Sequence, residues 1–311
     1  MQKVIEVSIV IVTWNAGKFI RECLESVFSQ NLDNLEVIIT DNNSTDGTLE
    51  IIESYMPRVC LIKNDENKGF CFANNQAIAI AQGEYILTLN SDVVLDKDYI
   101  SNLKKHFLNN NGIGMVQGKF LREDKKTIDS LGLYLSLSKR LFNIAEGQTN
   151  MPEFGQMQEI FGPCAAAAMY KRKLIEEISQ KGEFFDNDFY FLVEDFDVAW
   201  RARSFGWKAV YAPEAICYHL RNSSAHSLKF KQYLSFRNRY FMLIKNLSVK
   251  AAFGYTFYFL SYDLPRAIFL LFINPYIPKA IFEIAFFIPK LLQKRYKHKK
   301  QYEKIYEKRV Y

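Results

Sequence analysis

The sequence predicts an α/β protein built on a doubly wound, mostly parallel sheet, with amphipathic helices at its C-terminal end. Short apolar runs of strand length alternate with segments of helical periodicity over residues 1–120, a pattern typical of such sheets. Polar clusters follow three of these runs, at the points where the strands would end. The 311 residues are 49% hydrophobic and 24% charged, so the chain can bury a large core and is not disordered.

The expected strands are five short apolar runs. They cover residues 7–12, 35–40, 59–62, 85–89 and 113–117. Between the first two, residues 19–29 place apolar side chains at helical spacing. A helix between successive strands predicts that the strands pair in parallel.

The chain beyond residue 120 is less regular. Residues 121–160 hold a charged stretch and few strand signals, so we expect an insertion or a flexible loop beside the site. Residues 161–170 predict a strand, 193–205 a helix and 208–211 a short strand. A further helix is expected over residues 226–246.

The net charge of +6 is unevenly distributed. Residues 290–311 hold nine Lys or Arg and two Glu, a net charge of +7, which leaves −1 for residues 1–289. A basic tail on a nearly neutral body favours attraction to an anionic surface. We do not expect nucleic-acid binding, because no recognition module accompanies the charge.

Residues 251–311 combine Phe, Tyr, Ile and Leu with Pro breaks before the basic run. No uncharged stretch there reaches the ~18 residues that a membrane-spanning helix needs. Short apolar helices with basic flanks lie in the plane of lipid headgroups. We therefore expect this region to associate with a membrane surface; the alternative is that it closes a homodimer.

The five cysteines match no zinc or disulfide spacing, and the N-terminus does not resemble a signal peptide. Most of the cysteines stand among apolar neighbours. We expect buried, reduced thiols in a cytoplasmic protein, held at the inner face of the plasma membrane.

Three polar clusters follow the expected strands. They are Thr13 with Asn15, the run from Asp41 to Asp46 with Asn43 inside it, and Asn90 with Ser91 and Asp92. An acidic residue that ends the second strand can accept hydrogen bonds from a nucleoside, and an Asn/Asp pair can bind a divalent cation. Turn chemistry and helix capping are the alternatives, and they leave Asp41 unexplained.

Three carboxylates stand within four residues at Glu194, Asp195 and Asp197. Because they repel one another, their density indicates a cation, a shifted pKa or full solvation. A carboxylate at the end of the apolar segment before them is suited to be a general base. The alternatives are a helix N-terminus and a surface pair of Asp197 with Arg201. His219 follows 24 residues after Asp195, close enough in sequence to line the same cleft.

These pieces in this order resemble the family 2 glycosyltransferases, which are inverting enzymes of the GT-A fold. The resemblance covers roughly residues 5–245 and is closest to the rhamnosyltransferase-like branch. The matching segments are VSIVIVTWN at 7–15, DNNSTDG at 41–47, NKGFCFANN at 67–75, LNSD at 89–92, FD at 185–186 and EDFDVAWR at 194–201, continued by GWK at 206–208 and by His219. The sequence departs from the family at Asn90, where a full DxD motif has Asp.

The resemblance implies a role for each matching position. Asp195 would be the general base and Glu194 would orient it or exchange roles with it. Asp92 would bind a divalent cation, Mg²⁺ or Mn²⁺, with His219 as a further metal or diphosphate ligand, and Trp200 and Arg201 would support the acceptor. The donor nucleotide would be held by Thr13, Asn15, Asp41, Asn43, Gly69, Phe70, Asn74, Asn90 and Ser91.

The implied activity is transfer of a sugar from a dTDP- or UDP-sugar to a saccharide or lipid-linked acceptor in surface polysaccharide synthesis, with rhamnose the leading sugar. The domains would be a GT-A domain over 1–225, a connecting helix over 226–250 and the membrane-associating or dimerising region over 251–311. Two alternatives stay open. One is a sugar-nucleotide nucleotidyltransferase, although Trp14 to Lys18 makes a poor phosphate loop. The other is a catalytically silent, membrane-docked scaffold.

Overall fold

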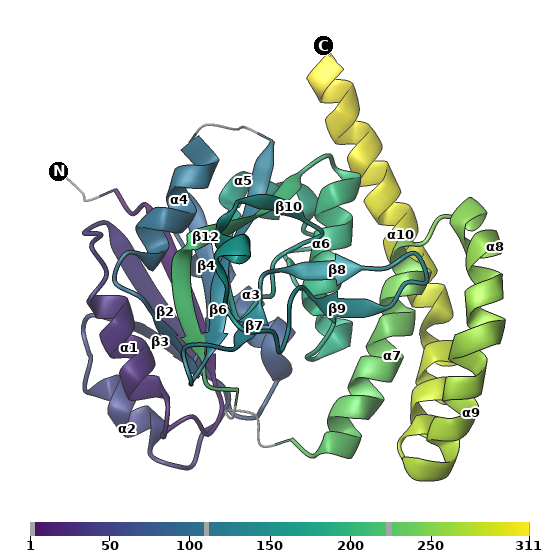
Figure 1. Ribbon diagram of the computed structural model, residues 1–311, viewed down its shortest axis with the longest axis horizontal. Coiled ribbons are helices and arrows are strands. Elements are labelled where there is room, and N and C mark those ends of the chain that lie inside the picture. Colours follow the sequence, from purple (N-terminus) through teal and green to yellow (C-terminus); the bar gives the residue numbers. More distant parts are fainter. Residues whose placement is uncertain (1–3, 109–111, 222–225, 311) are drawn as a thin grey trace.

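A ten-stranded sheet forms the centre of the molecule in the computed structural model, which describes residues 4–108, 112–221 and 226–310 (Figure 1). The main path of the sheet has the order β10-β12-β6-β11-β4-β1-β2-β3. Its parallel half consists of β1 (Val7–Thr13), β2 (Leu35–Asp41), β3 (Cys60–Lys63) and β4 (Tyr85–Asn90), connected by α1 (Ile20–Phe28), α2 (Thr48–Glu53) and α3 (Gly69–Ile80). The predicted α/β class and its mostly parallel sheet are confirmed.

The other half of the sheet is mixed in direction. β11 (Ala167–Lys171) runs antiparallel to β4 and to β6 (Ile113–Arg122), whereas β12 (Lys208–His219) is parallel to β6. The short strands β5 (Val93–Leu95) and β10 (Gln158–Ile160) pair with β12, and β7 (Ile128–Ser130) pairs with β6. The strands expected at 113–117 and 208–211 are therefore longer than predicted, and the strand expected from residue 161 begins only at Ala167.

Residues 121–160 are ordered strands and turns, so the expectation of a flexible loop was wrong. They contain β7, a hairpin of β8 (Leu133–Leu135) and β9 (Leu141–Asn143), a 3-10 turn (Pro152–Gly155) and β10. Strands of three residues carry too little alternation to be recognised in a sequence. The hairpin reaches toward the C-terminal helices (Figure 1), where Arg239 Nε donates to the carbonyl of Lys139 at 2.9 Å.

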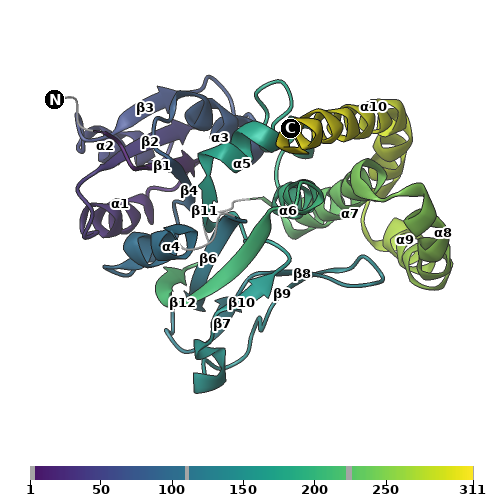
Figure 2. The same ribbon diagram turned by 90° about the horizontal axis from the view of Figure 1, so that it is seen from above.

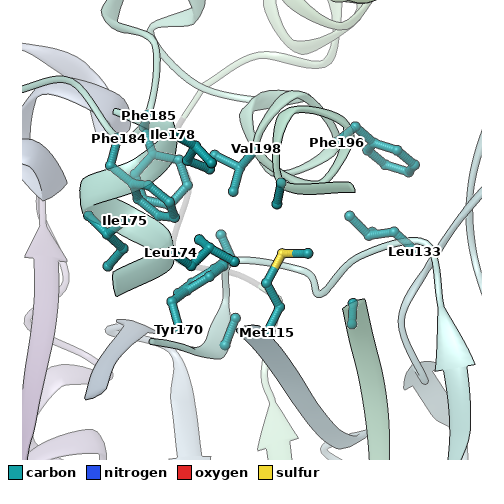
Figure 3. Close-up of a cluster of buried hydrophobic side chains, with 14 of the residues drawn as sticks. Met115, Leu133, Tyr170, Leu174, Ile175, Ile178, Phe184, Phe185, Phe196 and Val198 are labelled. Atoms are coloured by element: carbon teal, nitrogen blue, oxygen red, sulfur yellow. The ribbon is translucent and has the colours of Figure 1, made fainter. Parts of the chain in front are cut away.

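Helices cover both faces of the sheet. α1, α2 and α4 (Tyr99–Leu108) pack on one face, and α3, α5 (Arg172–Ile178) and α6 (Glu194–Ser204) on the other (Figure 2). Figure 3 shows the core beneath α6, where Phe196 and Val198 of the helix lie over Met115 and Tyr170 of the sheet. These apolar contacts fix the helix whose first two residues are Glu194 and Asp195.

The strand register brings the polar clusters together. In the parallel pairing of β1 and β2, Thr13 stands opposite Asp41. On the other side of β1, Val12 stands opposite Asn90 of β4. All three clusters therefore meet at the carboxyl edge of the parallel half, where ligands bind in sheets of this class.

Four helices follow β12. They are α7 (Leu228–Asn246), α8 (Val249–Tyr258), α9 (Leu264–Ile273), which a π-helical turn joins to α8, and α10 (Ile277–Val310). They gather at the end of the molecule opposite β1 to β3, with α10 packed against α7 (Figure 2). The expected helix over 226–246 is confirmed, whereas the expected domain boundary at residue 225 lies outside the described residues.

The C-terminal helices expose many large apolar side chains. The most exposed are Phe253, Phe257, Phe272, Phe282 and Phe286. In the part of the chain that the structure describes, Val249–Ile273 is the one helix long and apolar enough to cross a membrane, judged by length and composition alone. It includes Asp263 and Arg266, so it is not an uncharged run.

Candidate active site

The loops after β1 and β2 are tied together by the residues that sequence analysis assigned to the donor. The buried carboxylate of Asp41 accepts hydrogen bonds from Thr13 Oγ1 at 2.8 Å and from the amide of Ser44 at 2.9 Å. Asn15 Oδ1 accepts from the amide of Thr45 at 2.8 Å, and Ser44 Oγ accepts from the amide of Asn15. Thr13, Asn15 and Asp41 are brought together as expected, but their polar atoms hold the loops to each other. Asn43 is exposed beside them.

A pocket of about 140 Å³ opens at this edge of the sheet. Four expected donor residues line it, namely Gly69, Phe70, Asn90 and Ser91. Asn74 does not, because it is buried and its Nδ2 donates to the carbonyl of Phe70 at 2.9 Å. The other lining residues are Val12, Trp14, Asn42, Asn67, Tyr190, Phe191 and His226. The aromatic run 189–193 stood out in the sequence, but only the fold shows that two of its rings face this pocket.

Gly69 is required where α3 begins under Tyr190. Its φ is +84°, a conformation that L side chains rarely adopt. A Cβ at this position would lie 2.4 Å from the Tyr190 ring. The glycine therefore lets the pocket wall close on the start of the helix.

Glu194 and Asp195 stand at the N-terminus of α6, and the pKa of each is raised. Burial and the neighbouring charge of Asp195 raise the pKa of Glu194 well above its usual value. Burial also raises the pKa of Asp195, but only to about 6, because backbone amides stabilise its ionised form. Among the described residues, Glu194 Oε2 has no hydrogen-bond partner. Asp195 is therefore the better suited of the two to act as a general base, because backbone amides stabilise its ionised form.

The Asp195 carboxylate lies close to the strand edge that carries Asn90. One of the backbone groups that lower its pKa belongs to Ala165. The next residue, Ala166, accepts a hydrogen bond from the amide of Asn90 at 2.8 Å. The candidate base and the cluster at the end of β4 thus share one short stretch of backbone.

The loop before α6 has an unusual backbone. Tyr190, Leu192 and Val193 have φ values of 66°, 72° and 74°, although none is a glycine. Such conformations are rare for any L residue and rarest for β-branched ones, and they persist only when the surroundings enforce them. Strain of this kind gathers at functional sites, which fits the position of the loop between the pocket and Asp195.

Helix α7 holds this loop in place. The Nδ2 group of Asn238, which is fully buried, contacts the carbonyl oxygens of Phe189, Phe191 and Leu192 at 2.8, 2.9 and 2.8 Å. Arg237 adds a hydrogen bond from its guanidinium to the carbonyl of Phe189 at 3.2 Å. The role of Asn238 could not be predicted, since an Asn inside a helical pattern gives no signal of what its side chain meets.

Buried ion pairs connect α6 and α7 to α10. Asp197 accepts from Arg201 Nε at 2.8 Å and from Lys245 Nζ at 2.9 Å. Lys245 and Lys294 of α10 both reach Asp186 at 2.5 Å. Burial alone would raise the pKa of Asp197, but Lys245 and Arg201 outweigh it and keep that pKa below its usual value. A surface pair of Asp197 with Arg201 was the alternative weighed from the sequence; the pair exists, but it is buried.

The acceptor role expected for Arg201 stays a prediction, and its side chain is bound inside the protein. It is buried, and its remaining N–H groups donate to the carbonyls of Ile178 and Phe184 at 3.0 and 2.6 Å. Trp200, its neighbour in the sequence, is half-buried and packs edge-on against Phe161 at 6.3 Å between ring centroids. The helical period separates the two side chains, so only Trp200 lies on the more open side of α6.

Asp92 is paired with His219. His219 Nε2 lies 3.5 Å from Asp92 Oδ1, and its Nδ1 lies 2.8 Å from Asp129 Oδ2. Burial disfavours the charged imidazole, but the hydrogen bonds to Asp129 and Asp92 prevail and raise the pKa of His219 to about 9. His219 is an ion-pair partner of Asp92 and Asp129 in this arrangement, and its assignment as a metal or diphosphate ligand stays a prediction. Asp129, which lies in the region taken for a loop, had not been foreseen.

The donor chemistry of Asp92 suits a divalent cation. A buried carboxylate is a ligand that Mg²⁺ and Mn²⁺ prefer. No cluster of three or more His, Cys, Asp or Glu able to hold a metal occurs among the residues described. Asp92 therefore fits such an ion only if water or a substrate phosphate completes the coordination, as is usual for Mg²⁺.

The chain matches the family model described as glycosyl transferase family 2 over residues 8–179, more than half of its length. The chain belongs to this family. The match covers the strand edge with Thr13, Asp41 and Asp92, and it ends before α6. The family expected from the sequence is thus confirmed, and family 2 glycosyltransferases bind nucleotide-sugar donors and saccharide acceptors.

Several curated relatives are polysaccharide synthases. A poly-β-1,6-N-acetyl-D-glucosamine synthase of Staphylococcus epidermidis is 24% identical over 221 residues, which are 70% of this chain and 51% of that protein. A chondroitin synthase of Escherichia coli is 40% identical over 103 residues, 32% of this chain and 15% of that protein. The chain spans about half or less of the length of these relatives.

Solved structures establish the GT-A fold. The crystal structure of TarS from S. aureus aligns with a TM-score of 0.54 and 18% identity over 83% of this chain and 44% of that one. A mannosyltransferase from Pyrobaculum calidifontis, in complex with GDP-Man and Mn²⁺, aligns with a TM-score of 0.51 and 18% identity over 94% of this chain and 73% of that one.

We expect Asn238→Ala to lower the free energy of unfolding by about 2–4 kcal/mol, because buried carbonyls lose their donor and the strained loop loses its clamp. Urea denaturation measures the change. Asn102→Ala is the matched control, since the Nδ2 of this half-exposed residue donates to a single carbonyl, that of Glu214 at 2.9 Å. The control should lose less than about 1 kcal/mol. Equal losses in both variants would show that Asn238 does not hold the loop.

Proposed function

We propose that the chain transfers a sugar from a nucleotide-sugar donor to a saccharide or lipid-linked acceptor with inversion, as a step in surface polysaccharide synthesis. The observation that carries the proposal is the pair Glu194 and Asp195 beside a pocket built from the carboxyl ends of β1, β2 and β4. Membership of family 2 and the names of the polysaccharide synthases among its relatives support it.

The carboxylates fit a single displacement. Asp195 is ionised at neutral pH and can take the proton of the acceptor hydroxyl as its oxygen attacks the anomeric carbon. Glu194, whose pKa burial raises well above its usual value, is less suited to be the base, and we assign it to orient Asp195. The acceptor oxygen forms the new bond as the nucleoside diphosphate leaves from the opposite face, which inverts the configuration.

We assign the divalent cation to Asp92, with Asn90 beside it. When bound there, Mg²⁺ or Mn²⁺ would offset the negative charge that develops on the leaving diphosphate. The carboxylate of Asp92 and the nearby charge of His219 would hold the diphosphate end of the donor, while Gly69, Phe70 and Ser91 would shape the nucleotide wall. The sugar proposed is rhamnose from dTDP-rhamnose, with UDP-sugars as the second choice.

A thermal-shift screen tests the donor site. We expect one nucleotide series among UDP, dTDP, GDP and their sugars to raise Tm when Mn²⁺ or Mg²⁺ is present, because a ligand at 100 times Kd stabilises the folded state by about 2.7 kcal/mol. Asp92→Asn should abolish the metal-dependent part of the shift. A folded protein that no nucleotide stabilises, with or without metal, would overturn the donor site. A shift with GDP or UDP alone would replace dTDP-rhamnose.

The pKa of Asp195 predicts how transfer depends on pH. Its base form is lost below about pH 6, so kcat/KM should rise with pH and reach half its maximum near that value. Asp195→Asn should lower kcat by at least about 100-fold. Glu194→Gln, which keeps the size of the side chain at the orienting position, should lose much less. Initial rates between pH 4.5 and 8 measure both effects. A flat profile would show that Asp195 is not the base, and a cellular glycan left unchanged by Asp195→Asn would favour a silent scaffold.

We further propose that the C-terminal helices lie on the inner face of the plasma membrane, where a lipid-linked acceptor would be presented. The exposed Phe side chains of α8, α9 and α10 form an apolar face, and the second half of α10 carries the basic run. Anionic lipid attracts such residues by roughly 1 kcal/mol for each Lys or Arg near the surface.

Vesicle flotation tests this placement. The protein should bind vesicles of equal parts phosphatidylglycerol and phosphatidylcholine, and Phe253→Ser with Phe257→Ser should weaken binding at least about tenfold, because each ring buries apolar area in the interface. Leu108→Ser on α4, also strongly exposed, is the control and should bind as the parent does. If the Phe variants bind vesicles normally but turn a dimer into a monomer, the apolar face is a dimer contact instead.

A further inference from the structure

An imidazole closes the aromatic end of the pocket. The ring of His226 stacks on Trp14 with 4.9 Å between centroids and an angle of 27° between planes. It also stacks on Phe191, at 5.4 Å and again 27°. Trp14 follows β1, whereas Phe191 belongs to the strained loop before α6. His226 therefore contacts two sides of the pocket, one formed by Trp14 and the other by Phe191, which lie far apart in the sequence.

The surroundings of His226 are aromatic on several sides. Tyr190 meets it edge-on at 6.2 Å and Phe230 lies at 5.0 Å. Burial, together with the charge of Lys231, lowers the pKa of His226, so its ring is neutral at physiological pH. A neutral, planar, nitrogen-bearing ring that stacks on both Trp14 and Phe191 has the shape and chemistry of a stacked nucleobase.

The pocket is small with His226 in this position. Its volume of about 140 Å³ is below the about 300–1,000 Å³ typical of small-molecule sites. Asn42, Asn90 and Ser91 are polar lining residues without rings. Among the lining residues described, the stacked ring pairs are those that His226 forms with Trp14 and Phe191. A planar nucleobase would therefore find stacking partners, Trp14 and Phe191, at the position that the imidazole occupies.

We propose that His226 occupies the nucleobase subsite of the donor-free protein and that the base of a nucleoside diphosphate displaces it to stack between Trp14 and Phe191. This inference rests on the proposed donor site and adds an internal competitor to it. The nucleotide then competes with His226 for the space between Trp14 and Phe191, which we call the clamp. The apparent Kd is the intrinsic Kd divided by the fraction of molecules in which His226 has left the clamp.

Removing the competitor should strengthen nucleotide binding. We expect His226→Ala to bind its nucleoside diphosphate at least about fivefold tighter than the parent protein, because two ring contacts no longer have to be broken. His226→Phe keeps a flat ring in the clamp and should bind no tighter than the parent. Trp14→Ala removes one face of the subsite and should weaken binding. The measurement is isothermal titration with UDP and with dTDP in the presence of Mn²⁺, on the full chain.

Leu228→Ala, at an exposed position two residues further on, is the control for a change in this segment and should bind as the parent does. Weaker binding by His226→Ala would mean that His226 is a wall of the donor site, and an unchanged Kd would mean that its stacking is irrelevant to the donor; either result overturns the proposal. Nucleotide binding by neither the parent nor His226→Ala would instead remove the donor site itself, so the two failures are distinguishable.

Discussion

The backbone of residues 190–193 is the constraint on which the site depends. Three of these four residues are held at positive φ without a glycine, a conformation that the chain would leave if its surroundings allowed it. Asn238 binds the carbonyl of Phe189, just before this stretch, and those of Phe191 and Leu192 within it, so hydrogen bonds from another helix balance the strain. Two features of the site follow from this backbone. Phe191 lines the pocket, and α6 begins with Glu194 and Asp195 near the strand edge.

Helix α7 therefore holds the loop before α6 in place, besides connecting β12 to the C-terminal region. Besides Asn238, it supplies Lys245 to the buried carboxylates Asp186 and Asp197 and Arg239 to Asp263 of the apolar helices. A buried charge that loses its partner costs about 3–5 kcal/mol, so these pairs keep α7 in one position against both neighbours. A membrane face on α8 and α9 would in this way stand at a set orientation to the strand edge, which a lipid-linked acceptor requires.

The elements that sequence predicted well are those with a local cause. Apolar runs specified the strands, and the parallel register alone was enough to bring Thr13, Asp41 and Asn90 to one edge. What sequence could not supply depends on contacts between distant segments. Arg201 matched a family position, yet its partners are carbonyls 17 and 23 residues away. His219 meets Asp129, 90 residues earlier, within a region whose short strands leave no pattern. Asn238 lies inside a regular helix and gives no local sign of its role.

The loop of residues 190–193 lines the pocket proposed for the donor and also leads into Asp195, the proposed general base. Donor binding and deprotonation of the acceptor would therefore depend on the same segment. Phe191 is three residues from Glu194, and Val193 at positive φ lies between them as a stiff connection. A nucleobase that replaces His226 on Phe191 would contact a segment whose other end positions Asp195. In the donor-free state the imidazole gives the loop a similar ring to pack against, so the strained backbone keeps its shape while the pocket is empty of nucleotide. His226 would therefore help to hold Asp195 in position and would also compete with the donor nucleobase. The balance between these two effects decides how much binding energy the nucleotide must supply before transfer.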